Sequence, residues 1–217
     1  VFSKNETIYS NNQRYPEKTL YVSDRQAMRG VEFVNLEVAP FICYPEDKKI
    51  TIIDAIEVTI KENASPNEPI SKDFPKSKVF DRIINGLVIN PSPNNQTRTD
   101  EYQKPSILYI CGGSTESNSY FQQLVKWRKR QGYIVYTAST SETGGSTTTA
   151  IKNYIQNAMN WDIPPEFVTF VGDDGGSYNI DAYIEYDSGY NGEGDHPYSQ
   201  LDGNDLWPEV VLGRISV

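Results

Sequence analysis

The sequence predicts an α/β fold in which a parallel sheet with helices follows a small antiparallel β unit. In the first third of the chain, short runs alternate apolar with polar residues, typical of strands with one buried face. From Ser106 onward, continuous apolar runs alternate with segments of helical spacing, typical of a parallel sheet buried on both faces. Two stretches rich in Pro, Asn and Ser, 63–78 and 90–105, separate the two patterns.

The β unit is predicted over residues 1–75. Its clearest strand pattern runs from Ile50 to Ile60, where Ile and Val alternate with Thr, Glu and Lys. The other predicted strands are 20–23, 31–37 and 40–44. No helix is expected before about residue 75. Because the pattern begins abruptly at Val1, we expect further strands upstream.

Residues 76–105 are predicted to be a linker. Within it, Val79–Ile89 is a short apolar segment that we expect to pack onto a neighbouring domain. Arg98 lies in the second polar stretch, where exposed backbone is easily cleaved. The sheet domain is predicted over residues 106–217.

In the sheet domain, strand and helix patterns alternate. Helical spacing covers Asn118–Gln131, which Gly132 is placed to end, and Thr147–Asn160, which begins with Thr residues suited to capping. The predicted strands are Ser106–Cys111, Tyr133–Ala138, Phe167–Val171 and Val210–Leu212. This order predicts a doubly wound sheet, in which functional groups gather at the carboxyl ends of the strands.

Charge is distributed unevenly along the chain. The 217 residues carry a formal net charge of −9, which disfavours nucleic acid as a partner because phosphate binding needs a positive surface. Residues 172–209 hold seven Asp and three Glu but no Lys or Arg. No apolar run approaches the roughly 18 residues of a membrane span, so none is expected.

The acidic segment contains a candidate calcium site, since calcium takes about six to eight oxygen ligands from carboxylates and carbonyls. Asp205 and Glu209 can offer carboxylates, and the carbonyls of Asp202 and Trp207 can fill gaps in the shell. Asp173, at the end of the preceding strand, can fix the loop to the sheet. The alternative is that these acidic residues only form turns and cap chain ends.

The residues present do not form a complete catalytic set. His196 is the single His, and Cys43 and Cys111 lie in apolar strand-like runs, which are poor positions for a reactive thiolate. The turn at 112–113 follows a strand and precedes a helix, but it lacks the GxGxxG spacing and the GK[ST] lysine of nucleotide-binding loops. A tight strand-to-helix turn explains its glycines, and no organic cofactor is predicted.

From Ser106 to its end, the chain resembles the gingipain-type family of cysteine peptidases, which belongs to the caspase-like clan. The resemblance is carried by the order and spacing of the segments KWRKRQGY, FVGD and LDGND…GR. Residues 18–61, which include RGVEFVNLEVAPFICYPEDKKITIIDAIEVTI, resemble the closing part of the propeptide of that family.

The resemblance implies a caspase-like α/β sandwich, of which residues 106–217 form the first subdomain. It also implies that the catalytic His and Cys lie beyond Val217, so neither His196 nor Cys111 is expected to act in catalysis. Carried over by position, the calcium site of the family falls on the same oxygen-bearing residues: Asp173, Asp202, Asp205, Trp207 and Glu209.

The expected function is that of part of a bacterial cysteine endopeptidase, secreted or on the cell surface, with activation cleavage near Arg98. Its expected partners are protein or peptide substrates and the remainder of the catalytic domain. Two alternatives remain. One is a non-catalytic calcium-binding surface or secretion-associated module derived from a peptidase, and the other is a nucleotide-binding doubly wound domain.

Overall fold

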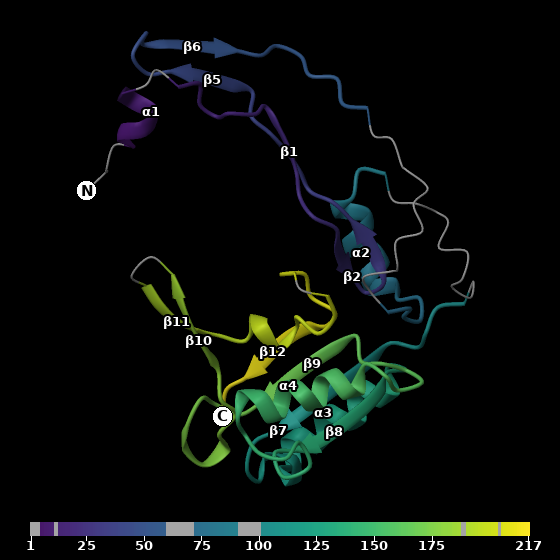
Figure 1. Ribbon diagram of the computed structural model, residues 1–217. Helices are drawn as coiled ribbons and strands as arrows, with labels where there is room; N and C mark the ends of the chain where they lie inside the picture. Colours follow the sequence, from purple (N-terminus) through teal and green to yellow (C-terminus); the bar gives the residue numbers. More distant parts are fainter. Residues whose placement is uncertain (1–4, 11–12, 60–71, 91–100, 188–189, 204) are drawn as a thin grey trace. The chain divides into compact units, whose positions relative to one another are not determined.

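The computed structural model describes residues 5–10, 13–59, 72–90, 101–187, 190–203 and 205–217 (Figure 1). The chain divides into two compact units. Unit 1 comprises Val1–Gln26 and Phe33–Pro69, and unit 2 comprises Ala27–Glu32 and Ile70–Val217. Ala27–Glu32 and the predicted linker therefore belong to the same compact unit as the sheet.

Unit 1 is built from antiparallel strand pairs. β1 (Leu20–Val22) pairs with β4 (Leu36–Val38), and β5 (Phe41–Tyr44) pairs with β6 (Lys49–Ile52). None of the residues that the structure describes in unit 1 is buried. The antiparallel strands predicted for this part of the chain are confirmed. The described residues of unit 1 do not form a buried core of their own.

Three elements of this region differ from the sequence prediction. β6 ends at Ile52 rather than near Ile60, because its partner β5 follows Pro40, which has no N–H to continue the ladder. The predicted strand 31–37 is divided into β3 (Val31–Phe33) and β4. A short helix, α1 (Glu6–Ser10), forms where none was expected, and the Asn5 side chain accepts a hydrogen bond from the Ile8 N–H at its start.

Unit 2 contains a four-stranded parallel sheet, which confirms the predicted α/β class. Its order is β12 (Val211–Ile215), β9 (Phe167–Val171), β7 (Ser106–Cys111), β8 (Ile134–Ser139). All six residues of the central strand β7 are buried. Because every pair is parallel, the strands begin at one edge and end at the other. We call these the amino edge (residues 105, 133, 164–166 and 209–210) and the carboxyl edge (112–113, 140, 172–173 and 216–217).

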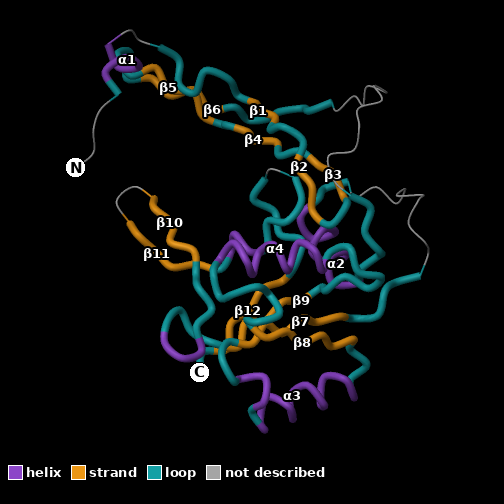
Figure 2. Tube along the Cα trace, turned by 60° about the horizontal axis from the view of Figure 1, so that its bottom comes forward, coloured by secondary structure: helices purple, strands orange, loops and turns teal. Residues whose placement is uncertain are grey.

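Helices cover both faces of the sheet (Figure 2). α3 (Ser119–Arg130) buries Phe121 and Val125 against one face, and α4 (Thr148–Ala158) buries Ile151 and Ile155 against the other. Each helix begins at a capping side chain, Asn118 or Thr147, that accepts hydrogen bonds from backbone N–H groups of the first turn. These two helices match the helical spacing of the sequence.

The predicted linker contains a third helix, α2 (Lys78–Leu87). Ser77 caps it by accepting from the Phe80 N–H, and Phe80 and Ile84 are buried. The expected packing of the apolar segment is therefore confirmed, but as a helix of unit 2. Among the described residues, no helix combines the length and apolar character needed to cross a membrane.

The long connection between β9 and β12 carries the acidic segment. It contains the hairpin of β10 (Tyr183–Asp187) and β11 (Tyr190–Gly194), followed by a short turn of helix at His196–Tyr198. Tyr198 is buried with its ring 4.8 Å from that of Phe170 in β9. This packing holds the acidic segment on the sheet.

Candidate functional site

Glu209 is fully buried, two residues before β12. Its Oε2 accepts hydrogen bonds from the N–H groups of Leu201 (2.7 Å) and Asp202 (3.3 Å), whereas its Oε1 has no hydrogen-bond partner. Burial raises the pKa of Glu209 to about 8; these two N–H groups lower it, and the charges of Asp205 and Asp202 raise it further. A buried carboxylate oxygen with no donor beside it is suited to a cation.

Asp205 and Asp202 lie in the same loop and bind backbone N–H groups. Asp205 accepts from Trp207 through Oδ1 (2.9 Å) and from Ala27 through Oδ2 (2.8 Å). Asp202 accepts from the Lys72 N–H at 2.8 Å. These are the roles that the turn-forming alternative predicts. They do not exclude a cation, because each carboxylate oxygen has a second lone pair.

Asp173 lies at the opposite edge of the sheet. It follows β9 at the carboxyl edge, where its carbonyl accepts from the Ile180 N–H. Glu209 lies at the amino edge, because the Val211 N–H donates to the carbonyl of Glu166, just before β9. In the register of the two strands, Glu209 is level with Pro165. The eight residues from Pro165 to Asp173 span about 25 Å of strand, which is the separation of the two sites along the sheet.

The single five-residue site predicted from the sequence is therefore corrected. Because β12 runs parallel to β9, the connection between them must return to the amino edge before β12 begins. Asp173, at the start of this connection, therefore stays at the carboxyl edge, away from Glu209. The structure brings together Asp202, Asp205, Trp207 and Glu209 on one loop. Among the described residues, no three Asp, Glu, His or Cys side chains form a group that would hold a metal by themselves.

A calcium ion on this loop would accordingly take no more than two carboxylates. The unpartnered Oε1 of Glu209 fits such an ion, with one further carboxylate from Asp205 or Asp202. The remaining ligands would be backbone carbonyl oxygens, including those of Asp202 and Trp207, and water.

At the carboxyl edge, glycines make room for another segment of backbone. A β-carbon on Gly112 or on Gly172 would lie 2.2 Å from the carbonyl oxygen of Tyr178. One on Gly113, whose φ is +54°, would lie 2.4 Å from the carbonyl oxygen of Ser177. These glycines therefore allow the 177–178 backbone to pack directly against the turn. An open, polar pocket of about 470 Å³ lies beside Gly113, and its other lining residues are Thr140, Ser141, Gly144, Gly145, Ser146, Ser177 and Asn179.

Arg214 in β12 balances part of the negative charge of the acidic segment by pairing with Asp195. This role was not predicted from the sequence. The Arg214 guanidinium donates to both carboxylate oxygens of Asp195, at 2.8 and 2.7 Å, and to the carbonyls of Gly172 and Ile180. The available signal was that Arg214 is the first basic residue after the acidic segment.

The thiol and the imidazole of unit 2 do not have the surroundings of a catalytic pair. Cys111 is buried at the end of β7, and burial raises its pKa to about 12, so that it stays protonated and poorly nucleophilic. His196 Nε2 lies 3.0 Å from the carbonyl oxygen of Leu206, within the acidic segment. Cys43 lies on β5 of unit 1.

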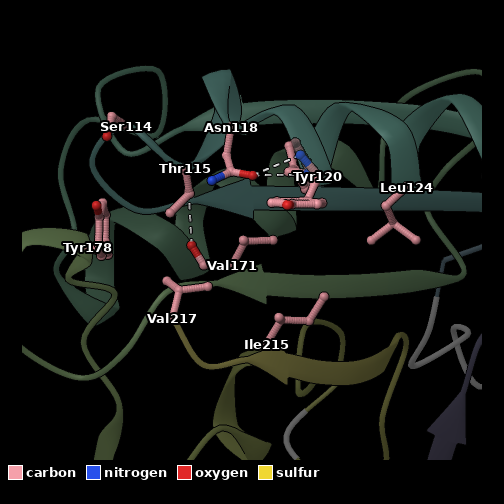
Figure 3. A pocket seen from close by; sticks show the side chains of 10 residues that line it. Ser114, Thr115, Asn118, Tyr120, Leu124, Val171, Tyr178, Ile215 and Val217 are labelled. Carbon is pink, nitrogen blue, oxygen red and sulfur yellow. Dashed lines mark hydrogen bonds between the residues drawn. The ribbon is translucent and has the colours of Figure 1, made fainter.

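A mostly apolar pocket of about 400 Å³ lies at the carboxyl edge, between α3 and the ends of β9 and β12 (Figure 3). Leu124, Val171, Ile215 and Val217 line it, and Asn118 at its rim caps α3. Its ten lining residues include no acidic, basic, His or Cys side chain. The apolar part of the pocket therefore suits an apolar group, with the hydroxyl-bearing residues Ser114, Thr115, Tyr120 and Tyr178 also in the lining. Arg98, the predicted cleavage position, lies outside the described residues.

The chain is similar to known peptidases over almost its whole length. It is 24% identical to Gingipain R1 of Porphyromonas gingivalis over 213 residues, which is 96% of this chain and 20% of that protein. It is also 24% identical to Gingipain R2 of the same species over 215 residues, or 96% of this chain and 28% of that protein. The chain thus spans less than a third of the length of these relatives.

The solved structures that are similar include the crystal structure of the Arg-specific cysteine proteinase gingipain R. The identity is 21% and the TM-score 0.43, with 55% of this chain and 26% of that chain covered. Residues 2–114 match the family model of the C25 propeptide, and residues 100–217, more than half of the chain, match that of peptidase family C25. The resemblance seen in the sequence is thereby confirmed, and the chain belongs to peptidase family C25, the gingipain-type cysteine peptidases.

Proposed function

We propose that the chain is part of a bacterial cysteine endopeptidase, secreted or on the cell surface, that hydrolyses protein or peptide substrates. The observation that supports this most directly is the order of the two family matches, propeptide before peptidase. Residues 106–217 would form the first subdomain of the catalytic domain and pack with its remainder. Activation would follow cleavage near Arg98, two residues before the peptidase match begins at residue 100.

In the intact enzyme, a Cys thiolate attacks the peptide carbonyl while a His transfers the proton to the leaving amine. We place both residues beyond Val217. The protonated Cys111 and the engagement of His196 within the acidic segment support this placement. The part described here would supply the sheet on which the catalytic loops rest.

Replacing Cys43 by serine or Cys111 by alanine in the protein extended beyond Val217 is expected to leave kcat/KM for a fluorogenic peptide within about twofold of the parent. Alkylation with iodoacetamide should abolish hydrolysis in the parent and in both variants, because the reacting thiol is a third one. A large loss of kcat/KM in a Cys111 variant that is still folded would contradict the assignment. Absence of hydrolysis by the extended protein would favour the non-catalytic calcium-binding module.

We further propose that the loop 202–209 binds calcium through Glu209. Calcium at about a hundred times its dissociation constant is expected to stabilise the chain by about 2.7 kcal/mol, because it binds the folded state alone. Thermal unfolding in calcium chloride and in EDTA measures this difference. Glu209→Gln should remove it, since the amide carries no charge for the ion.

Asp173→Asn provides the matched control, because it removes a carboxylate at the opposite edge of the sheet. This variant should keep the full response to calcium. If the wild-type protein unfolds at the same temperature with and without the chelator, the loop carboxylates act only in turn formation and the calcium proposal is wrong.

A further inference from the structure

A fully buried arginine lies at the amino edge of unit 2. Arg29 and Gly30 form the two-residue turn between β2 (Gln26–Met28) and β3, with φ angles of +51° and +81°. Positive φ at both positions suits a tight hairpin but is uncommon for a residue with a side chain. Arg29 nevertheless occupies the first position, and its side chain has no exposed surface.

The guanidinium of Arg29 is surrounded by backbone carbonyl oxygens. Nη1 donates to the carbonyls of Pro165 (3.0 Å) and Glu209 (2.9 Å), and Nη2 donates to that of Pro164 (3.3 Å). The guanidinium carbon also lies 5.1 Å and 5.2 Å from the ring centres of Phe74 and Phe80. Carbonyl dipoles in the plane and aromatic faces beside it are the surroundings that a flat, delocalised cation prefers.

The backbone of the same hairpin is also held. The Ala27 N–H donates to Asp205, and Ala27 and Met28 are buried. A β-carbon on Gly30 would lie 2.9 Å from the carbonyl oxygen of Lys72, so the turn fits closely into unit 2. These contacts present the arginine in one orientation.

We propose that Pro164, Pro165 and Glu209 form a guanidinium-binding site whose ligand is Arg29, and that this site anchors the propeptide-type hairpin to the peptidase-type sheet. Arg29 lies in the propeptide match and its three carbonyl partners lie in the peptidase match. The site is at the amino edge, so the anchor leaves the carboxyl edge open. It does not depend on the proposed peptidase activity, because no catalytic residue takes part in it, and Arg29 uses the main-chain carbonyl of Glu209 rather than the carboxylate proposed to bind calcium.

Chemical rescue in the full 217-residue chain tests the site. Arg29→Ala is expected to lower the Tm by about 10 °C, because the carbonyl groups lose their donors and the rings lose the cation. Guanidinium chloride at about 20 mM should then raise the Tm of this variant by several degrees, because the ion fills the vacated site. Sodium chloride and urea at the same concentration should have no such effect, and the wild type should not respond.

Arg29→Lys keeps the positive charge but lacks the planar set of donors. The decrease in its Tm should therefore be at least half the decrease seen for Arg29→Ala. Arg82→Ala, on the exposed face of α2, is the matched control and should change the Tm by about 1 °C or less. If Arg29→Ala does not fold alone, its refolding yield with guanidinium against sodium chloride gives the same readout. A lysine variant as stable as wild type, or the lack of any guanidinium-specific gain, would overturn the proposal.

Discussion

Replacing Phe170 by alanine is expected to lower the free energy of unfolding of the chain by about 4 kcal/mol. Phe170 lies on the central part of the sheet with no exposed surface. Its ring centre is 4.8 Å from that of Tyr198 and 5.1 Å from the Arg214 guanidinium. The substitution therefore leaves a cavity where β9, β12 and the acidic segment meet.

Urea unfolding followed by circular dichroism measures the loss, with the transition midpoint and slope fitted together. Tyr120→Ala is the control, because Tyr120 is 80% exposed and removal of its ring should change stability by less than about 0.5 kcal/mol. Equal stability of the Phe170 variant and the wild type would mean that the acidic segment does not pack on β9.

Gly112→Ala is expected to destabilise the chain by about 3 kcal/mol or more, although it adds a single methyl group. The new β-carbon would lie 2.2 Å from the carbonyl oxygen of Tyr178 and 2.6 Å from its carbonyl carbon. Both are backbone atoms, so no side-chain rotation can relieve the clash, and the connection after β9 must move.

The same substitution elsewhere in unit 2 should act in the opposite direction. Gly86 lies within α2, and a β-carbon there would meet nothing within 4 Å. Gly86→Ala should stabilise the chain by up to about 1 kcal/mol, since alanine favours a helix more than glycine does. Thermal unfolding of the two variants side by side distinguishes a steric clash at Gly112 from a general effect of introducing alanine. If the Gly112 variant is as stable as the wild type, the close contact with Tyr178 is ruled out.

The two inner strands of the sheet could be predicted to the residue, whereas β8 is shifted by one residue from the predicted 133–138 and β12 runs to Ile215 rather than ending at Leu212. Ser106–Cys111 and Phe167–Val171 were expected as strands and are strands with the same bounds, because strands buried on both faces must be apolar along their whole length. The strands of unit 1 were harder to predict. The Ile and Val alternation continues to residue 60, but a strand needs a partner, and pairing ends at Ile52.

The loop 202–209 could be found from its acidic residues, but the position of Asp173 could not be inferred from its place in the chain. Residues at the two ends of a connection between parallel strands lie at opposite edges, so proximity in sequence order misled the prediction. Arg29 gave no sequence signal, because its partners are carbonyl groups of three residues more than 130 positions away.

The Arg29 site also bears on how the family can diverge. Every amino acid carries a main-chain oxygen, so the acceptor side of the contact tolerates almost any substitution that preserves the path of the chain. Selection would act on the arginine, on the glycine after it and on the shape of the loop. Distant homologues could thus retain the same arginine–carbonyl contact with little sequence identity. In such homologues it should be sought as an arginine on a two-residue turn rather than as a pair of opposite charges.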